Sequence, residues 1–472
     1  MSCDAGVCTA TASKAVLNVG DLQTMLASGD VAAKTGSVAN DIAIVRLLSW
    51  NSTSRLTLDA NTNLNVQAPV TVTGSGAITL TYNNSGSKGD LIFSNGGNAT
   101  FANLSSSLVI NGNSYTLIGD IKSLASATGV NPYGFYALAR DYDASTDGTY
   151  RHSPITQFTG TLEGLGHSIF HLAIRAGEDS DVGLFARFFV QKHKPAGALR
   201  NLALNDVIIK GANVVGALVG ISNSNIHRCF VTGTVRASGT VGGLVGATGG
   251  EGVVSNSGAD VTVEGGRSET GGLVGSAAAN ISDSFARGSV SGRFAGGLAG
   301  GAAAIIQRSY SVAKVTGQGN GSRNHFVGGL VGGGGIGSVI VDSYATGSVT
   351  GATKGLAGGL AGFMYKFGGK QTASFMATSY STGLVQCGAE ARCGGFSGLV
   401  DGVRSNFWDV TTSGTSQGVG KGCGSRSCQA NVTGLTDDQL KSALPDGFNP
   451  AIWGQSPDIN NGYPYLLANP PQ

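Results

Sequence analysis

The stretch that decides the fold lies between residues 216 and 400, and its clearest copy reads Gly271-Gly272-Leu273-Val274-Gly275, then Ser284-Phe285-Ala286-Arg287-Gly288-Ser289-Val290. The five-residue tag occurs six times, at intervals of 26, 29, 25, 32 and 30 residues. Such intervals are typical of supersecondary units that stack on their neighbours in a solenoid. The six tags begin at Gly216, Gly242, Gly271, Gly296, Gly328 and Gly358.

The residue types in the tags suit a stacked coil of parallel strands. Leu and Val can form an internal apolar column, and Gly allows the backbone to come close or turn where the coil bends. Ser and Thr can hydrogen-bond backbone groups that a turn leaves unpaired. Crossovers between parallel strands are right-handed in nearly all proteins. The sequence therefore predicts an all-β fold, a right-handed parallel β-helix (β-solenoid) with short helical or irregular caps.

Composition narrows the function classes. Glycine accounts for 77 of 472 residues without a three-residue period, which excludes collagen, and the 41% of hydrophobic residues argues against disorder. A formal net charge of +2 gives no field that would attract nucleic acid. The sequence contains no run of 18 apolar residues, so we expect neither a nucleic-acid partner nor membrane insertion.

Pattern changes along the chain predict five segments. Both ends are expected to carry short helices that cover the open rungs of the coil, because exposed strand edges recruit other chains. Leu22, Met25 and Leu26 share one helical face before Gly29, and Thr436 to Gln439 form a capping-box start. Trp453, Tyr463 and Tyr465 are expected to seal the last rung. The segments are an N-terminal cap (1–54), coils of short alternating strands (55–118), an insertion-rich section (119–200), the tagged repeats (201–403) and a C-terminal cap (404–472).

The seven cysteines form three close pairs and one single residue. Each pair could close a small loop by a disulfide, which indicates an oxidising compartment; free thiols and zinc ligands are the alternatives. Cys229 replaces the Ser of a repeat and is expected to be a small buried side chain. The disulfide candidates are Cys3 with Cys8, Cys387 with Cys393, and Cys423 with Cys428.

The tags resemble the GLUG repeat of large bacterial surface proteins, including regions of immunoglobulin-A-protease-type proteins, over residues 180–400. The stretches Leu56-Thr57-Leu58-Asp59-Ala60 and Val109-Ile110-Asn111-Gly112-Asn113 are similar to coils of filamentous-haemagglutinin-type adhesins. This resemblance implies a β-helical surface adhesin and an outer-membrane secretion partner. It carries over no catalytic residue, so we expect a chain that is not an enzyme and needs no cofactor.

The first residues, Met1-Ser2-Cys3-Asp4, lack the basic start and apolar core of a signal peptide. The Asn-Pro-Asn motifs of the haemagglutinin secretion domain are missing as well, since Asn131-Pro132-Tyr133 stands in another context. We therefore expect a segment of a larger protein, located outside the cell or on the bacterial surface.

Two sets of residues are candidate sites. Asp283 and Asp342 occupy the same position of the repeat, so they could pair as the carboxylates of a polysaccharide lyase or hydrolase, or serve as turn residues at a corner. The other set interrupts the last tagged repeat and could bind a host-cell or extracellular glycan or protein. It consists of Phe363, Tyr365, Lys366 and Phe367.

These observations favour a non-catalytic segment of a secreted adhesin, which binds ligands of host or neighbouring cells through an elongated surface. A passive stalk within a larger surface protein is the first alternative. A polysaccharide-cleaving β-helix is the second.

Overall fold

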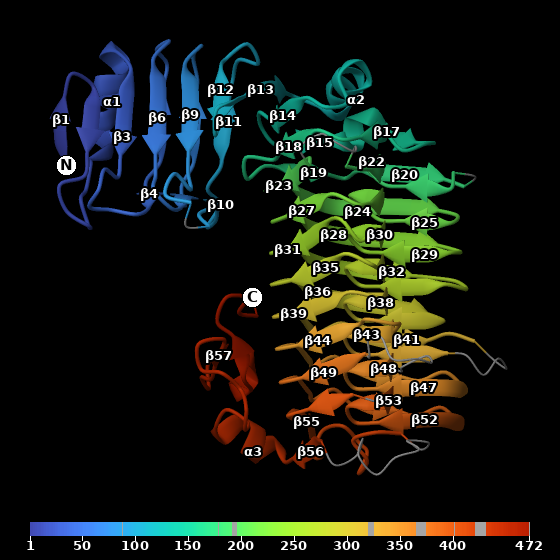
Figure 1. The fold of residues 1–472 in the computed structure, drawn as a ribbon. Coiled ribbons are helices and arrows are strands. Elements are labelled where there is room, and N and C mark those ends of the chain that lie inside the picture. Colours follow the sequence, from blue (N-terminus) through green and yellow to red (C-terminus); the bar gives the residue numbers. More distant parts are fainter. Residues whose placement is uncertain are drawn as a thin grey trace. The chain divides into compact units, whose positions relative to one another are not determined.

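A computed structural model describes residues 1–86, 88–177, 179–190, 196–319, 325–364, 374–400, 402–420 and 431–471 (Figure 1). The chain divides into two compact units, and the boundaries between them fall between residues 144 and 204, mostly within the predicted insertion-rich section. Unit 1 comprises Met1–Ala144, Thr159–Phe170 and Gly197–Ala203, and unit 2 comprises Ser145–Phe158, His171–Ala196 and Leu204–Gln472.

Unit 1 contains a short coil with three strand faces, formed by the alternating segments of the sequence. In successive rungs Leu56 lies opposite Ile78, and Ile78 opposite Leu108, all three of them buried. The main face runs through β1 (Ser2–Asp4), β2 (Val7–Thr9), β3 (Val31–Lys34), β6 (Arg55–Asp59), β9 (Ala77–Thr81), β12 (Leu108–Ile110), β13 (Asn113–Ile118), β14 (Phe135–Leu138), β18 (Thr161–Glu163) and β23 (Ala198–Arg200). The other faces are β4 (Ile42–Ile44), β7 (Leu64–Val66) and β10 (Leu91–Phe93), and β5 (Leu48–Trp50), β8 (Val70–Val72) and β11 (Ala99–Phe101). Unit 1 also contains α1 (Val19–Ser28), α2 (Ile121–Val130), β15 (Tyr142–Asp143) and β19 (Ser168–Phe170), and the division between the units falls within η1 (Ala144–Asp147).

Unit 2 is the tagged coil, and its strands stack in parallel from rung to rung. The predicted parallel β-helix is thereby confirmed. The nine-stranded sheet contains β17 (Ile155–Phe158), β22 (Phe185–Phe188), β26 (Val219–Ser222), β30 (Val245–Thr248), β34 (Val274–Ala277), β38 (Ala299–Ala302), β43 (Val331–Gly334), β48 (Ala361–Met364) and β53 (Ser397–Val400). The eight-stranded sheet contains β21 (Asp181–Val182), β25 (Val214–Val215), β29 (Thr240–Gly242), β33 (Glu269–Gly271), β37 (Phe294–Gly296), β42 (Phe326–Gly328), β47 (Lys354–Gly358) and β52 (Glu390–Gly394).

Two further faces complete the rungs of unit 2. The first contains β27 (Asn225–His227), β31 (Val253–Ser255), β35 (Asn280–Ser282), β39 (Ile305–Gln307), β44 (Val339–Val341), β49 (Phe375–Ala377) and β54 (Val403–Arg404). The second contains β16 (Thr149–Tyr150), β20 (Ala173–Ala176), β24 (Ala203–Gly211), β28 (Phe230–Ala237), β32 (Gly258–Glu264), β36 (Phe285–Gly292), β40 (Tyr310–Ser311), β41 (Lys314–Gly317), β45 (Tyr344–Ala345), β46 (Val349–Thr350), β50 (Tyr380–Ser381), β51 (Val385–Gln386), β55 (Asn406–Asp409) and β56 (Val432–Leu435).

The tags form the inner column of the unit 2 coil. The amide of Leu273 donates to the carbonyl of Leu298 at 2.9 Å, and the amide of Leu298 to that of Leu330 at 2.8 Å. All three leucine side chains are fully buried. The first glycine of a tag is required by close backbone approach, since a Cβ on Gly271 would lie 1.9 Å from the Val274 carbonyl oxygen.

A buried hydroxyl ladder, made of Ser257, Ser284, Ser309, Ser343 and Ser379, crosses the rungs and explains the Ser of the second tag. Each serine Oγ accepts the backbone N–H of its counterpart one rung earlier at 3.1 to 3.2 Å. Each also donates to the carbonyl two residues before it, at 2.7 to 2.9 Å. Cys229 stands at the first position and is buried as predicted, and the Oδ1 of Asn406 accepts at the last.

We expect Ser309→Ala to lower the free energy of unfolding by about 1–3 kcal/mol, because the buried N–H of Ser284 loses its acceptor. Chemical denaturation of the purified chain measures this loss. The matched control is Ser289→Ala on a neighbouring strand, where the side chain is half-buried and the change should stay within about 0.5 kcal/mol. Equal losses for the two variants would contradict a special role of the ladder.

The predicted helical starts are both present. Helix α1 buries Leu22 and Leu26 and ends at Gly29, and α3 (Asp437–Ser442) begins with the capping box of Thr436 and Gln439. Helix α1 packs against β3 and β5 of unit 1. Helix α2, which the sequence reasoning did not predict, has Asp120 as its N-cap.

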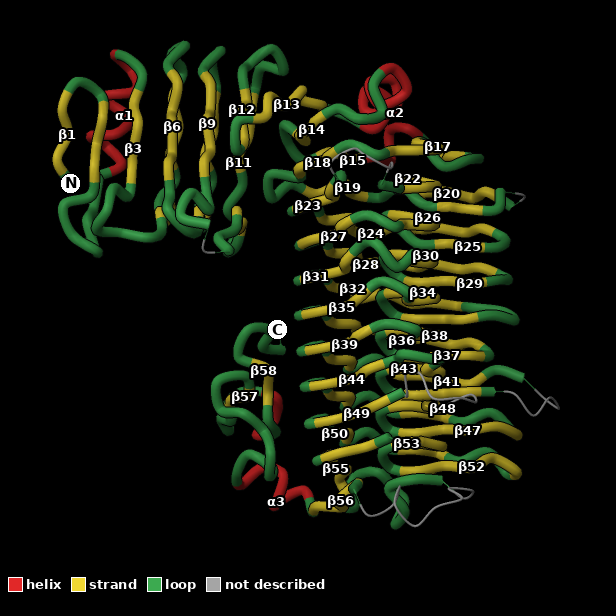
Figure 2. Tube along the Cα trace, viewed as in Figure 1, coloured by secondary structure: helices red, strands yellow, loops and turns green. Residues whose placement is uncertain are grey.

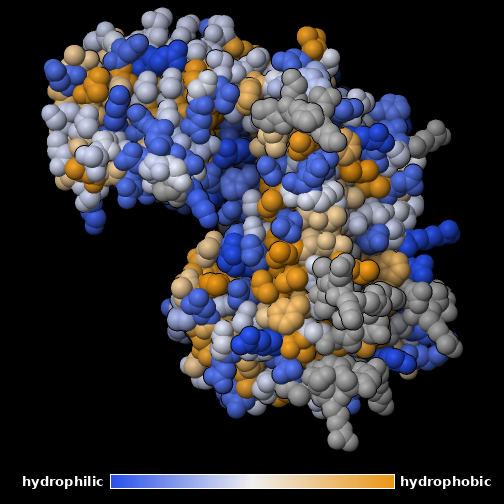
Figure 3. Space-filling model, in the orientation of Figure 1, coloured by the Kyte–Doolittle hydropathy of each residue, from blue (hydrophilic) through white to orange (hydrophobic). Residues whose placement is uncertain are grey.

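The C-terminal segment departs from the prediction, because it lies along the side of the unit 2 coil instead of over its last rung (Figure 2). Trp453 packs 5.9 Å from Tyr380 and 6.1 Å from Tyr344, between ring centroids. Figure 3 shows hydrophobic residues gathered on the coil beside this segment. The segment contains α3, β57 (Trp453–Gly454), η2 (Asn460–Gly462) and β58 (Tyr465–Leu466).

The segment covers a tyrosine ladder, formed by Phe285, Tyr310, Tyr344 and Tyr380 at one position of successive rungs. Their ring centroids are 5.5, 4.9 and 5.1 Å apart, in chain order. The hydroxyl of Tyr380 donates to the Pro464 carbonyl at 2.6 Å, so polar as well as apolar contacts hold the segment in place. The aromatic position of the second tag therefore faces a cover made by the same chain.

Candidate functional site

Three aromatic side chains form a row of neighbouring rings on the outside of unit 2, which we call the phenylalanine row: Phe294, Phe326 and Phe363. The ring centroids of Phe294 and Phe326 are 5.3 Å apart, and those of Phe326 and Phe363 are 4.6 Å apart. Each side chain is half-buried, whereas the next residue of β37 and β42 points inward and is buried. Partly exposed aromatic groups in a cluster are typical of binding surfaces.

The row crosses from one sheet to another because a glycine leaves room for it. Phe294 and Phe326 lie opposite each other on β37 and β42. Phe363 lies on β48, where its counterpart one rung earlier is Gly333. A Cβ built on Gly333 would be 3.4 Å from the ring of Phe326, so Phe326 occupies the surface that a side chain there would cover. The rings of Phe326 and Phe363 then stack with an interplanar angle of 13°.

Cationic and neutral groups surround the row. The Arg293 guanidinium lies 5.0 Å from the ring centroid of Phe294, within the range of a cation–π contact. Burial, and secondly the charge of Arg293, lower the pKa of the adjacent His325, so this side chain is neutral at pH 7. Further along the same sheet the Nζ of Lys354 pairs with the Glu390 carboxylate at 3.1 Å. The row is therefore an apolar strip with a cation against the ring of Phe294.

The structure places one of the four predicted ligand-binding residues in this row. Phe363 is its last member, while Tyr365, Lys366 and Phe367 lie outside the described residues. Sequence reasoning missed Phe294 and Phe326. The signal was present, since both stand two residues before the first glycine of a tag, at a position that alternation turns outward.

The candidate acidic pair does not form an open catalytic site. Asp283 and Asp342 have positive φ of 51° and 47°, as does Arg308 between them at 45°, so all three occupy the predicted corner. Arg308 donates to both carboxylate oxygens of Asp283, at 2.7 and 2.8 Å, and this bond is the main cause that raises the pKa of Arg308. Asp342 accepts from Thr378 at 2.6 Å and from Trp453 at 3.3 Å. An arginine thus separates the two carboxylates.

Two of the three candidate disulfides are present in the structure. Cys3 is bonded to Cys8, and Cys387 to Cys393, whereas Cys423 and Cys428 lie outside the described residues. Within the described ranges no group of three His, Cys, Asp or Glu side chains could hold a metal ion. The helices among these residues are all too short or too polar to cross a membrane.

Fold and site together define a parallel β-helix with an aromatic strip on its outer face. No family model matches the chain. Over 141 residues, which are 29% of this chain, it is 38% identical to halomucin from Haloquadratum walsbyi. The chain spans only about 1% of the length of that curated relative.

Two solved structures are similar to the chain at low identity. One is an IgA1 protease, with 20% identity, a TM-score of 0.40, and 61% of this chain and 21% of that chain covered. The other is a protein from Bacteroides ovatus named for its assignment to the immunoglobulin A1 proteases, with 15% identity, a TM-score of 0.43, and 75% of this chain and 93% of that chain covered.

The names of these structures correct one expectation from the sequence. We expected a chain that is not an enzyme, but both similar structures are named as proteases, so that exclusion does not stand. It relied on repeats without catalytic residues and on the scarcity of paired carboxylates. The contacts of Arg308 with Asp283 and of Thr378 with Asp342 argue only against catalysis by these two carboxylates as a pair.

Proposed function

We propose that the chain is a segment of a surface adhesin, of the filamentous-haemagglutinin and GLUG-repeat kind, that binds an extracellular ligand through the phenylalanine row. The observation that carries the proposal is the row itself, in which three half-buried rings contact one another across two sheets of the coil. The partial match to halomucin, a surface protein, and the two disulfides support a location outside the cell.

The ring geometry favours a polypeptide over a bare glycan as the ligand. Sugars bind aromatic residues mainly through the ring face, but the faces of Phe326 and Phe363 cover each other at 4.6 Å. The Arg293 guanidinium lies over the ring of Phe294. These contacts cover ring faces and leave ring edges to a ligand, and such edges suit apolar side chains and carbonyl oxygens. A host-cell or extracellular protein meets this requirement.

We expect the double variant Phe326→Ala, Phe363→Ala to raise the dissociation constant for the ligand about tenfold or more, because central aromatic side chains carry most of the energy of an interface. Biolayer interferometry against purified fibronectin, collagen, immunoglobulin A and a glycan array gives the dissociation constants. Gel analysis of each protein after incubation shows in the same experiment whether a bound ligand is also cleaved.

The matched control is Phe375→Ala, which removes another half-buried phenylalanine from a different sheet of the same coil. It should leave binding unchanged, and thermal unfolding should show that all variants are folded. A chain that binds no member of the panel would favour the passive stalk. Equal weakening by the control variant would remove the row from the proposal.

A further inference from the structure

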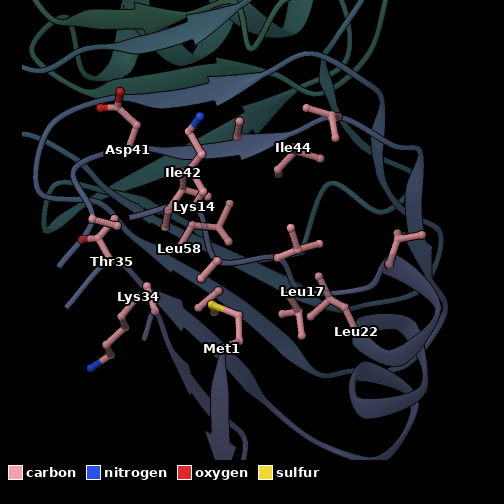
Figure 4. A pocket seen from close by; sticks show the side chains of 18 of the residues that line it. Met1, Lys14, Leu17, Leu22, Lys34, Thr35, Asp41, Ile42, Ile44 and Leu58 are labelled. Carbon is pink, nitrogen blue, oxygen red and sulfur yellow. The ribbon is translucent and has the colours of Figure 1, made fainter. Parts of the chain in front are cut away.

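Unit 1 contains a cavity of about 690 Å³ under its N-terminal cap, which we call the cap cavity (Figure 4). Its wall is mostly apolar, and a volume of this size is within the range that holds a small ligand. Figure 4 shows apolar side chains around the space and the polar ends of Lys14, Lys34 and Asp41 toward its edge. The apolar side chains that matter below are Leu17, Leu22, Ala33, Ile42, Ile44 and Leu58.

The cavity exists because the cap covers only part of the first rung. Helix α1 packs against β3 and β5, whereas β4 is the end strand of its sheet and pairs only with β7 among the described strands. Ile42 and Ile44 on β4 are half-buried. Their counterparts one rung later, Leu64 and Val66, are 0% and 2% exposed. The inner face of β4 thus lacks the apolar cover that its counterpart β7 receives in the next rung.

The rim of the cavity has an unbalanced positive charge. Lys14, Lys34 and Arg46 line it, and none of the three forms an ion pair with a described residue. Asp41 is the one acidic residue of the described lining, and its carboxylate accepts the N–H of Asn63 at 2.8 Å. Cations without partners beside an apolar space would attract an anionic head group.

We propose that the cap cavity binds an anionic amphiphile with a single acyl chain inserted, either a free fatty acid or one chain of an anionic lipid. The chain would lie against Leu17, Ile42 and Ile44, which it would shield from water. The head group would lie at the rim of Lys14, Lys34 and Arg46. This site is in unit 1 and is independent of the phenylalanine row in unit 2.

The test uses displacement of the fluorescent fatty acid cis-parinarate by dodecanoate from the full chain. We expect saturable binding of one molecule per chain. The double variant Lys14→Glu, Arg46→Glu should have at least tenfold lower affinity for dodecanoate. The uncharged dodecanol should bind the wild type with an affinity no higher than that of dodecanoate for the double variant. These exposed substitutions should leave the unfolding temperature unchanged, which separates lost binding from lost folding.

A second variant tests the cavity itself. Ala33→Phe would fill part of the space with a ring and should abolish displacement. Sedimentation with phosphatidylglycerol vesicles distinguishes the sources, because binding to vesicles would identify a membrane lipid and binding to free dodecanoate alone a fatty acid. Absence of saturable binding, or equal affinity of the wild type and the charge variant, would overturn the proposal. One further result would also overturn the proposal: the chain self-associates, Ala43→Pro on the β4 edge abolishes this association, and dodecanoate does not bind.

Discussion

Trp453→Ala is expected to lower the free energy of unfolding of unit 2 by about 3–5 kcal/mol, which is the usual cost of deleting a fully buried tryptophan. The indole is 1% exposed and packs against Tyr344 and Tyr380 of the tyrosine ladder. Its ring centroid also lies 4.6 Å from that of Phe448, and its Nε1–H donates a hydrogen bond to the Asp342 carboxylate at 3.3 Å. Its loss would open a cavity between the segment and the coil, and the segment would have to detach or collapse onto it.

Limited proteolysis and thermal unfolding together measure this effect. Cleavage should begin within residues 437–469 in the variant, while the wild type stays intact under the same conditions. Leu467→Ala provides the control, because that side chain is 48% exposed and its truncation should change stability by no more than about 0.5 kcal/mol. If Trp453→Ala is as stable as this control, the segment does not hold the coil together.

The second large effect concerns pH and the buried Glu163 of unit 1. Burial raises the pKa of Glu163 to about 7, although Arg200 and a hydrogen bond from Asn201 at 2.8 Å act in the opposite direction. Other groups that interact with Glu163 are Asp90, which pairs with Arg200 at 2.7 Å, and the phenols of Tyr82 and Tyr115. The network joins parts of the chain more than 100 residues apart, so its protonation affects the packing of unit 1 as a whole.

Because the pKa of Glu163 is higher in the folded chain than the ordinary 4.5, the folded state binds the proton more tightly. The resulting stability is fully present below pH 4.5 and is lost as the pH rises through about 7. The loss is on the order of 3 kcal/mol, at about 1.4 kcal/mol for each pKa unit. Unit 1 should therefore unfold more easily at pH 8 than at pH 5.

Glu163→Gln isolates this contribution, since Gln keeps the shape and an acceptor oxygen but does not titrate in this range. Calorimetric unfolding at pH 5, 6, 7 and 8 should show a smaller decline for the variant than for the wild type, and the difference between the two proteins should grow from pH 5 to about pH 7 and change little above it. A constant difference between the two proteins across this range would mean that Glu163 does not change its charge there.

The parallel coil could be predicted from the sequence because the tags repeat at the level of one rung. Leu273 and Leu298 occupy equivalent positions in the sequence, and stacking turns that equivalence into contact. The hydroxyl ladder follows for the same reason, and Cys229 fits it as a small side chain. Local signals were also sufficient for the start of α3, because Thr436 and Gln439 are three residues apart, but not for the place of the C-terminal segment beside the coil.

What could not be predicted depends on contacts between different rungs or distant segments. Phe326 and Phe363 lie at different positions of the repeat, and their rings meet over Gly333, which has no side chain to cover that surface. The place of Trp453 beside Tyr380 joins two parts of the chain that share no pattern. The cap cavity was missed because it is defined by what α1 fails to cover, and an uncovered strand has no signature in the residues that surround it.

The covered tyrosine ladder also has a consequence for the order of assembly. The ribosome makes residues 437–469 after the rungs that they cover, so Tyr310, Tyr344 and Tyr380 must wait for their cover while synthesis continues. During that interval a nascent coil would present an aromatic stripe to other nascent coils. Rapid completion of each chain, or a chaperone that occupies the stripe, would then decide how many molecules reach the native state instead of associating with one another.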